Sequence, residues 1–309
     1  MVMVSAVGAL LDGANIRHLL LDANMSVLEG SAGAIPRRIL VHESDDAAAR
    51  RLLTEDAFLA GRLRLRQFRR GHRSGHDAIL LAAAVPAHAG DHAIEFGAGA
   101  GAAGLALARR VEGINLTLVE IDPALVDLAQ TNAQANDIAA RTILLDICAS
   151  AAAFVDAGLP PDHVDHVMMN PPFHAADRHR ASPDEAKRAA HLDAGETLDV
   201  WIKAARRILK PGGCLTLIWR ADELDRVLNV LRRGFGAVEV VPVYPKPGAA
   251  AIRVLVRAIK GSRGPLQILP GLVLNDRQGR PTAAAEHVLQ GGALGSGPGG
   301  ETAREMLEK

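Results

Sequence analysis

The stretch that points most directly to chemistry is "VDHVMMNPPF", Val164 to Phe173, where an apolar run ends in Asn-Pro-Pro-Phe. Asn170 offers a side-chain carbonyl and Pro171 a backbone carbonyl, and proline has no N–H of its own to compete. Held by rigid prolines, two such acceptors would bind both N–H groups of an aromatic amine and localise its lone pair for attack on a sulfonium methyl. Phe173 would stack on the ring. The plainer alternative is a strand ended by prolines, with a buried Phe.

A second motif, "EFGAGAGAAG", places four glycines between a predicted strand and a predicted helix: Gly97, Gly99, Gly101 and Gly104. Glycines let the chain turn tightly and approach a ligand closely. The last three form G-x-G-x-x-G, which with Glu120 after the next strand fits a nicotinamide dehydrogenase. The overlapping spacing of the first three fits S-adenosylmethionine, and an ordinary glycine-rich turn is a third interpretation.

Carboxylates end the next two predicted strands. Glu120 suits two ribose hydroxyls, and Asp146 suits an adenine amino group. The carboxyl ends of adjacent parallel strands converge on one crevice, so these groups should meet the glycine turn there. Asn170 follows the fourth strand at the same edge. A dehydrogenase has no use for acceptors at that place, so the combination favours a methyl donor.

The elements that must position these residues alternate between strand and helix. Strands are predicted over 92–96, 115–121, 141–146, 162–169, 214–219, 237–243 and 251–258. Helices are predicted over 77–85, capped by Ser74 or Asp77, and over 102–111, 123–136, 149–158, 198–209 and 222–236. The last two strands share a short loop and must be antiparallel neighbours. We therefore predict an α/β fold: a Rossmann-like, mostly parallel seven-stranded sheet with one antiparallel strand and helices on both faces.

The chain has 309 residues, of which 49% are hydrophobic, enough for one large core. We expect a weakly patterned, disordered extension over 1–50, with an accessory helix as the alternative, one domain over 51–290, and a flexible Gly-rich tail over 291–309. Cys148 and Cys214 form no disulfide framework. No apolar run approaches the roughly 18 residues of a membrane span. We expect a cytoplasmic protein that does not bind to or span a membrane.

Basic and acidic residues balance at 35 each, so any nucleic-acid surface must be local. The densest basic run lies in and after "GRLRLRQF", residues 61–68, which alternates like a strand or hairpin. Arginines on one strand face could contact RNA phosphates, although a solvated strand face is the alternative. The candidate RNA-binding residues are Arg62, Arg64, Arg66, Arg69, Arg70, Lys260 and Arg263. The histidines match no closed ligand set, so we expect no metal.

Together these motifs resemble the class I S-adenosylmethionine-dependent methyltransferases of amino groups, with "NPPF" in the position of their N/D-P-P-Y/F motif. More narrowly, the chain is similar to the methyltransferase small domain proteins of the tRNA1(Val) (adenine-37-N6)-methyltransferase type. That similarity rests on "TEDAFLAGRLRLRQ", "GHRSGHDAILLAAA" and "RVLVRAIKGSRGPLQILPGLVL". It covers about residues 52–290.

The resemblance implies S-adenosylmethionine as cofactor and RNA, in particular tRNA, as partner, with methyl transfer to adenine N6. Guanine-N2 methylation of ribosomal RNA and glutamine-N5 methylation of proteins remain alternatives. It implies cofactor contacts from Asp77, Glu95, Gly97, Gly99, Gly101, Glu120 and Asp146, and a catalytic set of Asn170, Pro171, Pro172 and Phe173. Glu95 stands where Asp is commoner in the family. We expect a monomer.

Overall fold

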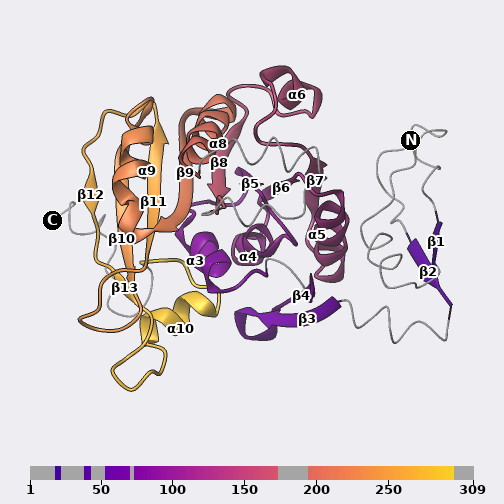
Figure 1. Cartoon of the computed structure of the whole chain (residues 1–309), viewed down its shortest axis with the longest axis horizontal. Coiled ribbons are helices and arrows are strands. Elements are labelled where there is room, and N and C mark those ends of the chain that lie inside the picture. Colours follow the sequence, from indigo (N-terminus) through magenta and orange to yellow (C-terminus); the bar gives the residue numbers. More distant parts are fainter. Residues whose placement is uncertain (1–17, 22–37, 43–52, 70–72, 173–193, 296–309) are drawn as a thin grey trace.

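The structure, a computed structural model, describes residues 18–21, 38–42, 53–69, 73–172 and 194–295. One large sheet organises this described part, in the strand order β12-β10-β11-β9-β8-β5-β6-β7, with β13 also paired to β10 (Figure 1). Its strands are β5 (His92–Phe96), β6 (Asn115–Glu120), β7 (Ala140–Leu144), β8 (Val164–Met169), β9 (Leu209–Arg220), β10 (Phe235–Tyr244), β11 (Arg253–Lys260), β12 (Gln267–Ile268) and β13 (Leu272–Val273).

Strand direction follows from what lies between the strands. The neighbours β7, β6, β5, β8 and β9 run parallel, whereas β11 is antiparallel to both β9 and β10. Only a short loop joins β10 to β11, and a short loop cannot return a chain to a parallel position. The predicted mostly parallel seven-stranded sheet with one reversed strand is therefore confirmed. The two-residue strands β12 and β13, too short to show a period, extend its edge.

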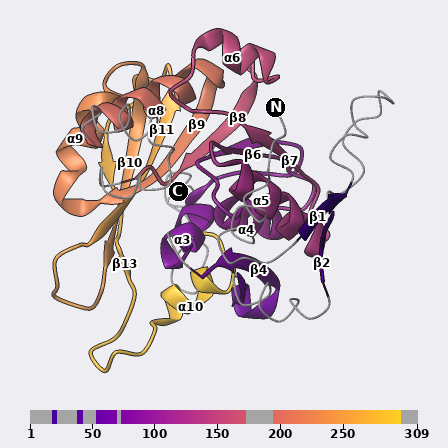
Figure 2. The same cartoon turned by 45° about the vertical axis from the view of Figure 1, so that its right-hand side comes forward.

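Helices cover both faces of the sheet (Figures 1 and 2). One face carries α3 (His76–Ala84), α4 (Ala102–Arg110), α5 (Pro123–Ala135) and α10 (Ala283–Leu289), and the other carries α6 (Ala151–Asp156), α8 (Ala194–Ile208) and α9 (Leu224–Leu231). The strand β8 shows how both cores form, since Met168 packs into the first and Met169 into the second. Burial on both faces explains why these strands are continuous apolar runs.

The arginine-rich segment forms the predicted hairpin, from β3 (Leu53–Phe58) and β4 (Leu63–Phe68), joined by the short turn η3 (Leu59–Gly61). Leu63 and Leu65 are fully buried, while Arg64 and Arg66 between them are exposed. The alternation therefore does what its period of two predicts. The hairpin packs against α4 and α5, next to the glycine turn.

Two local expectations were wrong in detail. Gly75 is the N-cap of α3 and makes no side-chain cap bond, so neither Ser74 nor Asp77 caps this helix. The backbone N–H of Ser74 instead donates to Gln67 Oε1 at 2.8 Å. The strand expected from residue 214 begins at Leu209, because the Lys-Pro-Gly-Gly segment enters β9 with a shift in its pairing to β8.

Both ends of the chain are described only in part. Within residues 1–50, β1 (His18–Leu21) and β2 (Arg38–Val41) pair antiparallel. The other residues for which we expected disorder lie outside the described residues, apart from His42. Of the predicted tail, residues 291–295 are described, and the Leu294 N–H donates to the Ala83 carbonyl at 2.9 Å.

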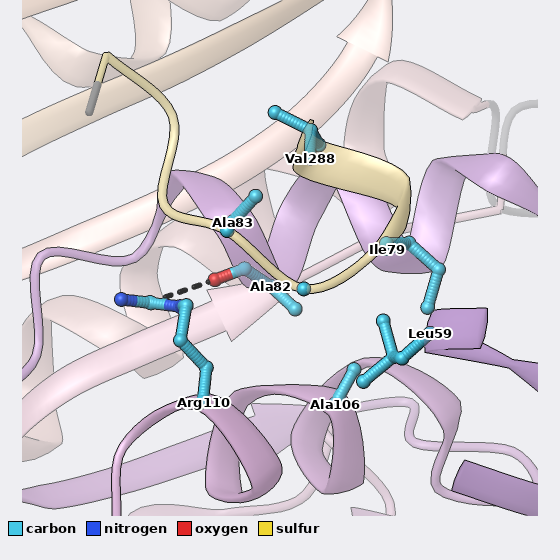
Figure 3. A pocket seen from close by; sticks show the side chains of 9 residues that line it. Leu59, Ile79, Ala82, Ala83, Ala106, Arg110 and Val288 are labelled. Carbon is cyan, nitrogen blue, oxygen red and sulfur yellow. Dashed lines mark hydrogen bonds between the residues drawn. The ribbon is translucent and has the colours of Figure 1, made fainter. Parts of the chain in front are cut away.

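A small cavity lies where α10 meets α3 and α4 (Figure 3). Arg110 closes one side of it, donating from Nη2 to the carbonyls of Ala82 at 2.9 Å and Val85 at 2.6 Å. The other lining residues are apolar side chains and glycines, namely Leu59, Ile79, Ala83, Ala106, Val288, Gly291 and Gly292. This cavity includes no part of the glycine turn or of Asn-Pro-Pro, so it is a packing defect away from the predicted chemistry.

Candidate active site

The glycine loop, residues 97–101, turns the chain from β5 into α4. Gly97, Gly99 and Gly101 have φ angles of +65°, +56° and +88°, a left-handed region that side chains disfavour. A Cβ on Gly97 would lie 2.5 Å from Cη2 of Trp201, whereas a Cβ on Gly99 would meet nothing within 4 Å. The loop is therefore packed at Gly97 and open at Gly99, where a ligand can approach the backbone.

Glu120 closes the loop from the neighbouring strand. Its Oε2 accepts the Gly99 N–H at 2.8 Å, and its Oε1 accepts those of Ile121 at 2.8 Å and Asp122 at 3.0 Å. The side chain is 8% exposed. Burial raises its pKa, and the three N–H groups oppose that shift. A carboxylate held in this way at the strand end is placed to accept hydrogen bonds from the hydroxyl groups of a ligand.

Glu95 has a different environment from Glu120. It is buried inside the turn, and its Oε2 accepts the Gly104 N–H at 2.6 Å. Burial raises the pKa of Glu95 to about 8, and the nearby Glu120 adds to the shift. A side chain on Gly104 would collide with Glu95 Oε2 at 2.8 Å. Glu95 thus ties the end of β5 to the first turn of α4.

The two predicted aspartates lie at the same edge of the sheet, each with a protein partner. Asp146 is exposed after β7, and its Oδ1 accepts the Cys148 N–H at 2.8 Å. Asp77 in the first turn of α3 pairs with Arg253 of β11, with Nε and Oδ2 3.0 Å apart. Asp146 is therefore beside Glu120 in strand order, whereas Asp77 is tied to the β11 side.

Asn170 directly follows β8, and Phe96 of β5 is the register partner of Met169. The amide thus lies beside the glycine loop at the carboxyl edge of the sheet. Its Oδ1 is buried and has no hydrogen-bond partner in the described part of the chain. Pro171 is buried and Pro172 partly buried, while Phe173 lies outside the described residues. Burying a hydrogen-bond acceptor without a partner costs free energy of folding, so this oxygen is a candidate to accept a hydrogen bond from a ligand.

The family model described as "Methyltransferase small domain" matches residues 75–245, from α3 to the end of β10. The chain belongs to this methyltransferase family. The predicted resemblance to the methyltransferase small domain family is confirmed, and so is S-adenosylmethionine as the family's cofactor. A second model, described as "Putative prokaryotic signal transducing protein", matches residues 1–56.

Relatives of the chain have names that give different substrates. A tRNA1(Val) (adenine(37)-N6)-methyltransferase of Porphyromonas gingivalis is 30% identical over 158 residues, 49% of this chain and 60% of that protein. A ribosomal RNA small subunit methyltransferase C of Pseudomonas aeruginosa is 33% identical over 148 residues, 47% of this chain and 37% of that protein. A release factor glutamine methyltransferase of Chlorobaculum tepidum is 28% identical over 159 residues, 50% of this chain and 53% of that protein. The chain therefore spans about half to three fifths of the length of the first curated relatives.

A solved structure supports the fold. A protein from Agrobacterium tumefaciens whose title calls it a "predicted O-methyltransferase" is 31% identical, with a TM-score of 0.60 over 71% of this chain and 97% of that one.

The carboxyl edge of the sheet contains two candidate residues that the sequence did not single out. Trp201 of α8 lies against Gly97, and its ring meets that of Phe96 edge-on, with centroids 6.4 Å apart. Ile121, next to Glu120, is 55% exposed at the crevice edge. The sequence did contain a signal for Ile121, because an apolar residue directly follows the carboxylate at the end of a predicted strand. For Trp201 there was none, because helical spacing marks it only as core.

The predicted RNA-binding residues do not form one patch in the described part of the chain. Arg66 and Arg69 are exposed on the hairpin, and Arg64 is exposed beside Glu55, with Nη1 and Oε1 3.3 Å apart. Arg62 instead donates to the carbonyls of Leu59 and Gln290, and Arg70 lies outside the described residues. Lys260, paired with Asp162 at 2.6 Å, and Arg263 lie at the opposite, amino edge of the sheet.

Histidines gather at that amino edge. His166 is 8% exposed, and its Nε2 lies 3.0 Å from Asp91 Oδ2. The rings of His92 and His163 meet edge-on, 5.4 Å between centroids. In the described residues no three His, Cys, Asp or Glu side chains are arranged to hold a metal ion. Within the same residues no helix is long and apolar enough to cross a membrane.

Proposed function

We propose that this chain transfers a methyl group from S-adenosylmethionine to the exocyclic N6 amine of an adenine in tRNA. The observation that carries the proposal is the buried Oδ1 of Asn170, which has no partner among the described residues. An aromatic amine is a weak nucleophile because its lone pair is delocalised. Accepting one of its N–H groups at Asn170, and the other at the Pro171 carbonyl, would localise that pair and aim it.

The residues of the crevice fit the family's cofactor. Gly99 leaves open the space that a Cβ would fill, so the methionine part can approach the backbone there. Glu120 would accept the ribose hydroxyls while its three N–H partners hold it in place. Asp146 would accept from the adenine amino group. When bound, the cofactor supplies a methyl carbon activated by a positively charged sulfur.

The protein's part in the reaction is orientation. Asn170 and Pro171 would hold the amine nitrogen toward the methyl group that the bound cofactor would supply, and the amine would release its proton to solvent. Asn170 and Pro171 bind the amine before and during attack, which lowers the barrier by preorganisation. Phe173 would stack on the base.

RNA as substrate is supported by the hairpin and by the relatives. Arg66 and Arg69 are exposed on an element that packs next to the glycine loop, where they would contact phosphates. The target base must leave its stack to reach Asn170. The tRNA relative is matched over 60% of its length and the ribosomal RNA relative over 37%, which favours the adenine substrate.

The central test is binding and product analysis. Calorimetry should show that S-adenosylmethionine and S-adenosylhomocysteine bind, and absence of binding by both would overturn the proposal. Mass spectrometry of nucleosides from cells with and without the gene should show loss of N6-methyladenosine from tRNA. Loss of N2-methylguanosine from ribosomal RNA, of methylglutamine from protein or of an O-methylated product would each reject the adenine assignment in favour of another acceptor.

The role of Asn170 has its own test. Asn170→Ala should lower methyl transfer by about 100-fold or more, the usual cost of removing a preorganised transition-state contact. Its affinity for S-adenosylhomocysteine should stay near that of the wild type, because the amide faces the amine. Full activity in the variant would remove the assigned role.

A further inference from the structure

Asn132 of α5 and Asn136 at the C-cap of that helix are buried polar residues with no part in the chemistry described so far. Their exposed fractions are 1% and 7%. Spaced one helical turn apart, they lie on the same side of the helix, and both face the outer edge of β4. Buried amides are retained only when their hydrogen bonds are made, so their partners show what they hold.

Both amides bind the backbone of β4 as a neighbouring strand would. The Arg66 N–H donates to Asn132 Oδ1 at 2.8 Å, and Asn132 Nδ2 donates to the Arg66 carbonyl at 3.0 Å. Asn136 repeats this with Arg64, at 2.9 Å from the backbone N–H and 2.7 Å to the carbonyl. The two side chains thus fasten the hairpin to α5 through four equivalent bonds.

The two asparagines differ in their third bond. Asn132 Nδ2 also donates to the carbonyl of Ala100 at 2.9 Å, inside the glycine loop. Asn136 Nδ2 instead donates to the carbonyl of Asn132 at 2.8 Å, within its own helix. Phe68 of β4 packs with Ala100 in the same small cluster. Only Asn132 therefore joins the hairpin and the glycine loop with one amide group.

We propose that Asn132 is a positioning residue that couples the hairpin to the glycine loop and holds the loop in the shape the cofactor needs. The inference rests on the proposed function only in taking this loop as the cofactor's cradle. Gly97, Gly99 and Gly101, at alternate positions of the loop, have left-handed φ angles, and glycine adopts many other backbone conformations as readily, so the loop depends on contacts with its surroundings to keep one shape. Glu120 supplies one such contact at Gly99, and the bond from Asn132 to the carbonyl of Ala100, a residue that is 6% exposed, supplies another from the side of the hairpin.

The chain offers a matched control for the test. Asn132→Ala and Asn136→Ala each remove two bonds to β4, but only the first frees the Ala100 carbonyl. The affinity of S-adenosylhomocysteine should fall about tenfold in Asn132→Ala, equal to about 1.4 kcal/mol. In Asn136→Ala it should change by less than about twofold. Hydrogen exchange without ligand should be faster over residues 99–105 in the Asn132 variant only.

A second pair covers the case in which the alanine variants do not fold. Asn132→Asp and Asn136→Asp keep the acceptor for the β4 N–H and lose the Nδ2 donors, so the same contrast in affinity and exchange is expected. Equal effects of the paired substitutions, or no effect of either, would overturn the coupling while wild-type binding stands. If the wild type binds no S-adenosylhomocysteine, the proposed function fails, and the ligand-free exchange contrast still decides whether Asn132 holds the loop.

Discussion

Gly97→Ala should be among the most destabilising substitutions in the glycine loop, for two separable reasons. The backbone at Gly97 has a φ of +65°, and a left-handed conformation costs a residue with a Cβ about 1–2 kcal/mol. The new Cβ would also lie 2.5 Å from Cη2 and 3.1 Å from Cζ3 of Trp201. Overpacking of this kind costs about 1–3 kcal/mol. The free energy of unfolding should therefore fall by about 2–5 kcal/mol.

Gly99→Ala is the matched control for this prediction. Its φ of +56° carries similar strain, but its Cβ would meet nothing within 4 Å. We expect a loss of only about 1–2 kcal/mol in urea unfolding. Because that Cβ would enter the open side of the crevice, the affinity for S-adenosylhomocysteine should fall more in Gly99→Ala than its stability loss suggests.

The contact with Trp201 can be isolated by a double-mutant cycle. Trp201→Leu should remove most of the clash, so that adding Gly97→Ala then costs about 1–2 kcal/mol instead of about 2–5 kcal/mol. Equal costs of Gly97→Ala in both backgrounds would show that the indole does not limit the space at Gly97. The steric part of the reasoning would then be refuted, leaving only the backbone strain.

Three further predictions concern charge. Burial lowers the pKa of His166 despite Asp91, so the stability from its neutral form is present above pH 6.5 and lost as the pH falls; His166→Asn should flatten that acid loss in unfolding curves. Burial raises the pKa of Glu95 to about 8, which has the opposite effect on stability. The stability from the protonated form of Glu95 is lost as the pH rises through 8, and Glu95→Gln should abolish that loss. Arg66→Glu should weaken tRNA binding and reduce its salt dependence, whereas Arg263→Glu at the amino edge should do neither.

Much of the fold could be predicted because its signals are local. The period of two in the strands and the helical spacing between them give the order of elements, and the short loop before β11 dictates the reversed strand. Glycine spacing located the loop, and Asn-Pro-Pro marked the proposed amine site, since these patterns depend only on backbone geometry and side-chain chemistry. The reversed direction of β11 also predicts that Lys260 lies at the amino edge of the sheet. The ion pair that Lys260 forms there with Asp162 could not be predicted.

The contacts that hold the site were decided only in the tertiary structure. Asn132 bonds to Arg66, 66 residues away in sequence, and to Ala100, 32 residues away. Trp201 reaches Gly97 because α8 lies on the face of the sheet where Phe96 of β5 meets the Trp201 ring. No local period encodes such partners, since they depend on how the layers close. The sequence by itself determined which groups could do the chemistry. The tertiary structure decided that the buried Oδ1 of Asn170 has no hydrogen-bond partner among the described residues and that the loop beside it is bonded to Asn132 of α5.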